Sequence, residues 1–371
     1  MSVHGQTVIQ WLEQLAPKNL AEEWDNVGLQ IGTLEKQMSK VMVALDVTEA
    51  VVDEAIEQKA DLIIAHHPLL FKGVTQIRTD LPYGRILAKC IKHDLTVYAA
   101  HTNLDIAPGG MNDWLANRIG LEKADVLSPT GYESLKKLMV FVPRDHEAEL
   151  REALGRAGAG FIGNYSHCTF RTEGIGTFLP GEGTNPYIGT RGQIEQVEEV
   201  KIETVFPASI EKKVLQAMNE AHPYEEVAYD VFPLDQKGDA YGLGRIGDLP
   251  DDMSFREFIE HVKRVLDVRH CRYVGKEEEK VKKIALVGGS GRKYARAAQL
   301  KGADVFLTGD IDYHTAVDAQ RDGLKLVDPG HHIEKVMIQG VQEVIQRAAQ
   351  SHQADLSVIG STVHKDPFSF S

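Results

Sequence analysis

Three separated stretches of this 371-residue chain end in side chains that commonly bind metal ions. They are DLIIAHHPLLF with His66 and His67, YAAHTNLD with Asp105, and LVDPGHHIEKVM with His331 and Glu334. Each begins as an apolar run typical of a buried strand and ends in these ligand-type residues. Because open α/β sheets bind ligands at the carboxyl ends of their strands, the sequence predicts one metal centre assembled from all three stretches.

The spacing of these residues favours two ions over one. Side chains of neighbouring strand residues point to opposite faces, so we expect His66 and His67 to serve different ions, which lie about 3.5–4 Å apart in two-metal sites. His331 and Glu334 are three residues apart at the expected start of a helix, so both reach the same side. Glu334 can then bridge the ions through its two oxygens, and Asp105 completes the set of ligands.

The expected ligand set contains three imidazoles, two carboxylates and no thiolate. This set suits two divalent ions per chain, with zinc favoured and iron, manganese, cobalt or nickel as alternatives. Such ions lower the pKa of bound water to about 7 and so supply a nucleophile at neutral pH. The chemistry that the residues indicate is therefore metal-assisted hydrolysis.

The elements that must position these residues alternate between strands and helices. In the first third of the chain, strands are expected over 41–45, 61–65 and 95–100, with helices over 49–59, 83–93 and 112–119. The same rhythm resumes near Gly238, with strands over 283–287, 305–307, 324–327 and 356–359. This alternation is typical of mostly parallel sheets covered by helices on both faces. We expect an α/β fold in which two related α/β halves form the metal-binding core.

A segment with a different rhythm separates these halves. Its elements follow the order β-α-β-β-α-β, which predicts a ferredoxin-like α+β domain of about 100 residues. The expected domains are therefore an N-terminal half over 1–127, the inserted domain over 128–236 and a C-terminal half over 237–371.

Composition narrows the classes of function. The formal net charge of −13 argues against general nucleic-acid binding, which requires a basic surface. The three cysteines are far apart and form no CxxC pair, as is typical of a reducing compartment. No stretch approaches the roughly 18 apolar residues of a membrane span. We therefore expect a cytoplasmic protein that does not enter a membrane.

A glycine-rich sequence follows the expected strand over 283–287. Its residues are Gly288, Gly289, Ser290 and Gly291. Consecutive backbone N–H groups of this kind can hold a phosphate. A tight turn between a strand and a helix is the simpler alternative.

Three more polar residues fall near strand ends. Asp46 and Asp310 could each support a metal ligand or act as a general base, with the role of helix N-cap as the alternative. His101 is a candidate additional ligand, or a group that holds a ligand in place.

The motifs taken together resemble those of the YqfO-like family, whose members are often labelled GTP cyclohydrolase 1 type 2 homologues. The resemblance covers nearly the whole chain, and its segment near 130–235 is similar to the PII/CutA-like insert of the longer bacterial members. The motifs are WDNVGLQIG (Trp24 to Gly32), AHHPLLF (Ala65 to Phe71), AAHTNLD (Ala99 to Asp105), GGSG (Gly288 to Gly291), TGD (Thr308 to Asp310) and GHHIEKVM (Gly330 to Met337).

The resemblance implies a cytosolic toroidal homohexamer, a trimer of dimers, with a dinuclear metal centre facing a central cavity. It places one ion on His66, Asp105 and Glu334, and the other on His67, His331 and Glu334. Shorter members commonly have one more residue between the last two ligands. His332 therefore remains an alternative to His331.

We expect a dinuclear metal-dependent hydrolase that acts on a nucleotide or a related phosphate compound. The resemblance adds a specific reaction, GTP cyclohydrolase type 2-like opening of the purine ring with release of formate. Hydrolysis of a phosphoester suits a two-metal site equally well. The alternative is a non-enzymatic, metal-binding hexameric scaffold or regulatory protein whose insert senses a ligand or recruits a partner.

Overall fold

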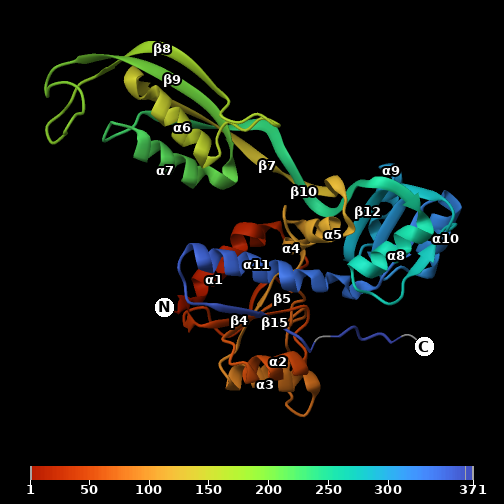
Figure 1. Ribbon diagram of the computed structural model, residues 1–371. Helices are drawn as coiled ribbons and strands as arrows, with labels where there is room; N and C mark the ends of the chain where they lie inside the picture. The colour runs from red at the N-terminus through yellow and green to blue at the C-terminus, as the bar shows by residue number, and fades with distance from the viewer. Residues whose placement is uncertain (1, 364, 370–371) are drawn as a thin grey trace. The chain divides into compact units, whose positions relative to one another are not determined.

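The computed structural model describes residues 2–363 and 365–369. The chain divides into two compact units (Figure 1). The first combines Met1–Thr130 with Tyr241–Ser371, and the second is Gly131–Ala240.

The first unit contains a five-stranded sheet in the order β15-β4-β5-β6-β2. Its strands are β15 (Ser357–Gly360), β4 (Lys40–Ala44), β5 (Leu62–Ala65), β6 (Thr96–Ala99) and β2 (Gly28–Ile31). The first four run parallel, and β2 pairs antiparallel with β6 at the edge. Every residue of β5 and β6 is buried, as expected for parallel strands covered on both faces.

Helices cover both faces of this sheet (Figure 1). Alternate residues of β4 face opposite layers: Val41 and Val43 pack with α1 and α11, whereas Met42 and Ala44 pack with α2 and α3. This is the period-2 alternation of a strand, and it explains why the strand is apolar throughout. The helices are α1 (Gly5–Leu15), α11 (Val336–Ser351), α2 (Glu49–Glu57) and α3 (Pro82–Lys92).

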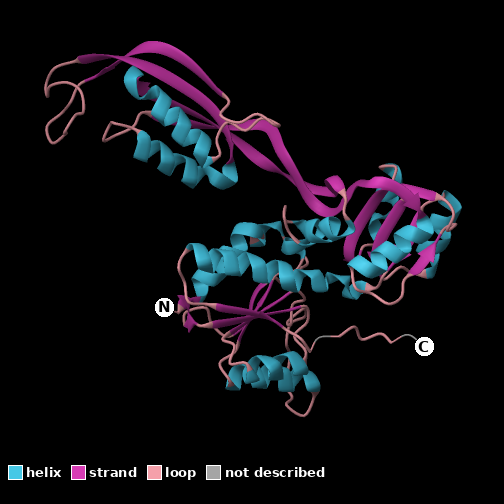
Figure 2. Cartoon of the chain, viewed as in Figure 1, coloured by secondary structure: helices cyan, strands magenta, loops and turns pink. Residues whose placement is uncertain are grey.

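A second group of strands in the first unit follows the order β11-β14-β13-β12-β10 (Figure 2). The central three run parallel, and β11 and β10 pair antiparallel at its two sides. The strands are β11 (Arg272–Val274), β14 (Lys325–Asp328), β13 (Val305–Gly309), β12 (Lys280–Ser290) and β10 (Tyr229–Ser254). The accompanying helices are α8 (Phe255–Val265), α9 (Ala295–Leu300) and α10 (Tyr313–Asp322).

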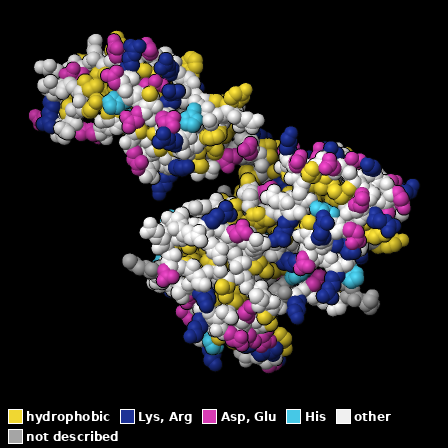
Figure 3. Space-filling view, in the orientation of Figure 1, with side chains coloured by type: hydrophobic (Ala, Val, Ile, Leu, Met, Phe, Trp, Pro, Cys, Tyr) yellow, Lys and Arg dark blue, Asp and Glu magenta, His cyan; other side chains and the backbone are white. Residues whose placement is uncertain are grey.

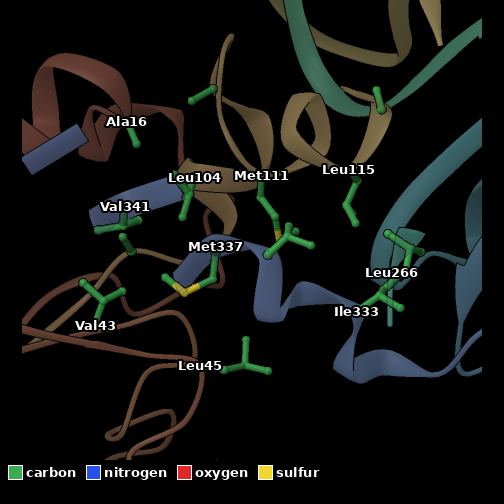
Figure 4. Close-up of a cluster of buried hydrophobic side chains, with 14 of the residues drawn as sticks. Ala16, Val43, Leu45, Leu104, Met111, Leu115, Leu266, Ile333, Met337 and Val341 are labelled. Carbon is green, nitrogen blue, oxygen red and sulfur yellow. The ribbon is translucent and has the colours of Figure 1, made fainter. Parts of the chain in front are cut away.

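One apolar core joins the two groups of strands within the first unit. It contains Val43 of the first sheet, Leu307 of the second, and Ile333 and Met337 from the segment that runs into α11. Figure 4 shows Met337 surrounded by side chains of this cluster. Shared burial of this kind holds two sheets as one body, because separating them would expose apolar surface at about 25 cal/mol per Å².

Polar contacts of α5 (Met111–Ile119) reinforce this junction. The Asn112 side chain donates to the Asp105 carbonyl and accepts the Gly288 N–H. The guanidinium of Arg245, which is buried, donates to both carboxylate oxygens of Asp113 at 2.6 and 2.7 Å. The stretch that contains Asp105 is thereby fixed against β12.

The second unit contains β7 (Glu122–Pro143) from Gly131 onward, α6 (Glu147–Ala157), β8 (Thr169–Phe178), β9 (Glu195–Pro207), α7 (Glu211–Ala221) and the start of β10. β9 pairs antiparallel with both β7 and β8. A separate apolar cluster, which includes Leu138, Val140, Leu150 and Val214, packs the two helices on these strands. The order of the elements is the one read from the sequence, and the ferredoxin-like classification and the relatedness of the two α/β halves stay predictions.

Several expectations about individual elements were wrong. Within the inserted segment, apolar runs predict short strands over 138–142 and 227–232, but β7 and β10 are much longer because their added residues carry no apolar run that would reveal a strand. The sequence also predicts two or three short strands with glycine-rich turns up to about residue 192, where the structure has a single strand, β8. A short helix, α4 (Thr102–Ile106), and the two-residue strands β1 (Val3–His4) and β3 (Gln37–Met38) were not expected.

The visible surface in Figure 3 carries Lys and Arg side chains interspersed with Asp and Glu. This mixture agrees with the acidic net charge of −13. No helix in the described part of the chain combines the length and the apolar character needed to cross a bilayer.

Candidate metal centre

The three predicted stretches meet at strand ends inside the first unit. His66 and His67 follow β5, and Asp105 lies on α4 shortly after β6. His331 and Glu334 lie on a 3₁₀ helix, His331–Lys335, that follows β14. Residues three apart on a 3₁₀ helix are eclipsed, so these two side chains project together, as their spacing predicted.

Glu334 lies at the middle of the group and is almost fully buried. Its Oε2 is 3.1 Å from His67 Nε2 and 3.0 Å from His331 Nε2, while its Oε1 is 3.8 Å from His66 Nε2. Asp105 Oδ1 is 3.5 Å from the same His66 nitrogen. The two oxygens of Glu334 therefore face two different sets of histidines.

Three groups of potential ligands result from this geometry, each with its ligand atoms within 4.8 Å of one another. His66, Asp105 and Glu334 form one, and His67, His331 and Glu334 form another. The third contains His66, His67 and His101, and His332 belongs to none of them. The structure thus brings together the five residues selected from the sequence, with His66 and His67 in different groups around Glu334 and together in the group of His101.

Each histidine in the two groups is held through its Nδ1 atom. His67 Nδ1 donates to Asp46 and His331 Nδ1 donates to Asp310, both at 2.7 Å, while His66 Nδ1 donates to the Ala100 carbonyl at 2.9 Å. Carboxylate and carbonyl oxygens can only accept, so Nδ1 must carry the hydrogen. Each Nε2 then faces the centre and is the atom that would bind a metal ion, as in metal-binding histidines.

Asp46 and Asp310 do not act as helix N-caps. The residue that caps α2 is Thr48, and the one that caps α10 is Asp312. The N-cap alternative was wrong for both, because each carboxylate is already turned toward a histidine. Asp310 contacts the candidate ligand His331, as expected for a residue that supports a metal ligand.

His101 lies beside the two groups and is held by a residue that sequence reasoning missed. Its ring centroid is 5.1 Å from that of His66, and its Nδ1 donates to Asp25 at 2.9 Å. The Asp25 side chain is fully enclosed and also accepts from Thr102. Burial alone would raise the pKa of Asp25, but the bonds from His101 and Thr102 outweigh it and lower the pKa to about 2. Only its place in the WDNVGLQIG motif distinguishes Asp25 in the sequence, and the Asp-Asn pair there is typical of a turn.

Two buried atoms show that the site suits a cation. Among the described residues, His66 Nε2 and Asp105 Oδ1 are buried without a hydrogen-bond partner. Burial lowers the pKa of His66, and burial with the nearby charge of Glu334 raises the pKa of Asp105. An unsatisfied buried polar atom costs free energy, and a divalent ion between a neutral imidazole and a carboxylate would satisfy both. The residues present therefore fit a bound metal.

Comparison with known proteins identifies the family. The family model for Duf34/NIF3 (NGG1p interacting factor 3) matches residues 3–367. This chain belongs to the Duf34/NIF3 family. It is 55% identical over 367 residues to a Halalkalibacterium halodurans protein named GTP cyclohydrolase 1 type 2 homolog, with 99% of each chain covered. A Bacillus subtilis protein of the same name is 52% identical over 369 residues, with 100% of this chain and 99% of the relative covered.

A solved structure supports the same conclusion. The crystal structure of a Bacillus cereus protein related to NIF3 has a TM-score of 0.90, 54% sequence identity and full coverage of both chains. The resemblance to the YqfO-like family that the motifs indicated is confirmed.

The glycine-rich sequence of this Duf34/NIF3 chain, for which we expected a phosphate site or a tight turn, has part of its N–H groups bonded within the protein. Gly288, Gly289 and Ser290 belong to β12. The Gly288 N–H donates to Asn112 and the Gly291 N–H donates to Thr308, so two of the four N–H groups are already used. The glycines serve instead to make room: a Cβ on Gly289 would lie 2.1 Å from Glu334 Oε1 and 3.1 Å from His331 Nε2.

We predict that Gly289→Ala weakens metal binding without removing a ligand. The added methyl group must displace the Glu334 carboxylate, so affinity should fall about 10- to 100-fold, the range for changes just outside a ligand set. Gly302→Ala is the matched control, because Gly302 also has a positive φ (+74° against +57°) but nothing within 4 Å of the added atom. Metal titration of both variants tests this, and equal affinities would contradict it.

Metal binding should also release protons. Burial lowers the pKa of His67, but the hydrogen bonds and charges of Asp46 and Glu334 outweigh it and raise the pKa to about 10. The bond from Glu334, with help from Asp310, raises the pKa of His331 to about 9 despite burial. Both histidines are therefore protonated near pH 7.5 in metal-free protein, and ligation must displace those protons.

We predict the release of about two protons per chain at pH 7.5, falling as pH approaches 9–10. Calorimetric titration in buffers of different ionisation enthalpy measures this number. Both folded-state pKa values exceed the unfolded value near 6.5. The stability that protonated His67 and His331 contribute to metal-free protein is thus complete below pH 6.5 and is lost as pH rises through 9 and 10. Binding heats that are independent of the buffer would refute the assignment.

Proposed function

We propose that this chain binds two divalent ions, zinc by preference, and hydrolyses a nucleotide or a related phosphate compound. The observation that carries the proposal is the buried Glu334 carboxylate, whose two oxygens face two separate histidine groups. When bound, two such ions polarise an acceptor oxygen and lower the pKa of water. The name of the relatives, GTP cyclohydrolase 1 type 2 homolog, adds opening of the GTP ring as one candidate reaction.

The residues of the chain have different roles at this site. Asp46, Asp310 and the Ala100 carbonyl fix the orientation of the ligand histidine rings through Nδ1, so that each Nε2 already faces the position of an ion. His101 is held in the same way by Asp25, which leaves its Nε2 able to accept a proton from a reacting group. We propose His101 as the proton acceptor of the site.

An aromatic pair near the centre supports a substrate with a planar ring. Trp24 is 56% exposed and Phe71 is 53% exposed, and their ring centroids lie 6.0 Å apart. Trp24 is also 6.0 Å from His101, which in turn is next to His66 and His67. Exposed aromatic rings bind nucleobases by stacking, at about 1–3 kcal/mol per base.

The metal claim has a direct test. Elemental analysis of the full chain loaded with zinc should find two ions per chain, and Glu334→Gln should lose most of both. Glu343→Gln, which changes an exposed residue of α11, should keep both. A wild-type chain that holds one ion would exclude bridging by Glu334.

Turnover is tested with a panel of nucleotides and other phosphorylated metabolites, with release of formate and phosphate measured together. We expect metal-loaded protein to consume at least one compound and His67→Ala to abolish this. Complete inactivity with zinc, iron, manganese and cobalt would favour the alternative of a metal-binding scaffold or regulatory protein. The homohexamer that the family resemblance implies is compatible with both the hydrolase and the metal-binding scaffold.

We predict that Trp24→Ala raises the KM of the substrate found in this way by about fivefold or more, as expected for the loss of about 1 kcal/mol of stacking. Trp24→Phe should keep most of the affinity because it keeps a ring. Tyr313→Ala removes an aromatic ring that is 77% exposed and serves as the control. An unchanged KM in Trp24→Ala would refute a stacking role.

A further inference from the structure

The second unit contains a cavity of about 470 Å³ that shares no residue with the metal centre. It is lined by the end of β8, the segment 179–188, Glu199 of β9 and residues 224–228 after α7. Its volume lies within the range of about 300–1,000 Å³ for small-molecule sites.

Aromatic rings from three separate segments line this cavity. The centroid of Tyr224 is 5.9 Å from that of Phe178 and 6.4 Å from that of Tyr187, with interplanar angles of 62° and 51°. Phe141 lines the cavity as well. Rings at such angles present both faces and edges to one cavity, and their faces carry the negative part of the ring quadrupole.

The charged residues of the lining are all acidic. They are Glu199, Glu225 and Glu226, and among the described residues no lysine, arginine or histidine lines the cavity. Phosphate groups and other anions would meet three carboxylates without a compensating cation, which costs binding energy. A positively charged ligand meets a favourable field.

Two of these carboxylates are held in place by the protein. Glu199 Oε1 accepts the hydroxyl of Tyr224 at 3.0 Å, and Glu225 accepts the Asn185 N–H at 3.0 and 3.2 Å. A Cβ on Gly176 would lie 2.1 Å from Glu199 Oε2, so this glycine gives the Glu199 side chain its room. Burial, followed by the bond to Glu199, raises the pKa of Tyr224, which keeps the phenol neutral.

A metal ion suits this cavity less well than an organic cation. Among the described residues, the groups able to hold a metal all involve His66 or His67, and none includes these glutamates. The wall instead combines apolar rings with negative charge. This combination is typical of sites for ammonium groups, which gain from cation–π attraction when desolvated.

We propose that the cavity of the second unit binds an organic ammonium cation with a small apolar body, held by the Tyr224 and Phe178 rings and the Glu199 carboxylate. The proposal does not depend on the chemistry of the metal centre. It gives the inserted unit a ligand of its own.

The test compares choline with its neutral, similarly shaped isostere 3,3-dimethyl-1-butanol, by calorimetric titration of the full chain at low salt. Choline should bind at least about fivefold more tightly, as expected for a cation–π contribution near 1 kcal/mol. Tyr224→Ala and Glu199→Gln should each weaken choline binding severalfold. Tyr224→Phe keeps the ring and should stay within about threefold of wild type.

Glu198→Gln is the matched control, since Glu198 precedes Glu199, is 77% exposed in its side chain and does not line the cavity. Equal binding of choline and the neutral isostere, displacement of choline by ATP, or normal choline binding by Glu199→Gln would each overturn the proposal. Circular dichroism identifies any variant that fails to fold. If Tyr224→Ala fails to fold, choline binding by Glu199→Gln and Tyr224→Phe tests the proposal.

Discussion

The structure of the first unit depends on one buried carboxylate, Glu334, placed among three imidazole nitrogens. A buried charge without compensation is strongly unfavourable, so everything around Glu334 must either supply compensation or give it room. Gly289 gives room on β12, where any side chain would strike the carboxylate. Gly309 on β13 gives room to the backbone of His331, because a Cβ there would lie 2.8 Å from the His331 backbone nitrogen. The glycines at these strand ends therefore reflect close packing of the segment that carries His331 and Glu334.

The same arrangement of side chains occurs at the ends of both sheets. His67 follows β5 and is held by Asp46, which follows the adjacent parallel strand β4. His331 follows β14 and is held by Asp310, which follows the adjacent parallel strand β13. Adjacent parallel strands end at the same edge, so an aspartate after one is within reach of a histidine after the next. This is the physical reason that a metal centre can be built from residues more than 260 positions apart.

Much of this could be predicted from the sequence, because apolar strands that end in His, Asp or Glu mark both the sheet and its ligand-binding edge. The five candidate ligands and most elements of the first unit were found in this way. The role of Asp25 could not be derived, and the sequence left Asp46 and Asp310 open between supporting a ligand and capping a helix. An aspartate after a strand or in a turn has the same sequence pattern whether it caps a helix or holds a histidine. The role of Gly288–Gly291 was missed for a related reason. A glycine that is needed because a residue distant in sequence packs against it has the same sequence pattern as a glycine that is needed for a turn.

The two sites differ in the charge of the ligand that each can accept. The two carboxylates Asp105 and Glu334 would not cancel the charge of two divalent ions, so the proposed metal centre would attract anions such as phosphates. The cavity of the second unit is lined by three carboxylates and, among the described residues, by no basic residue, so it repels the same anions. A phosphate compound suited to the proposed metal centre is therefore a poor ligand for the cavity. It follows that a ligand of the cavity differs in charge from the substrate proposed for the metal centre.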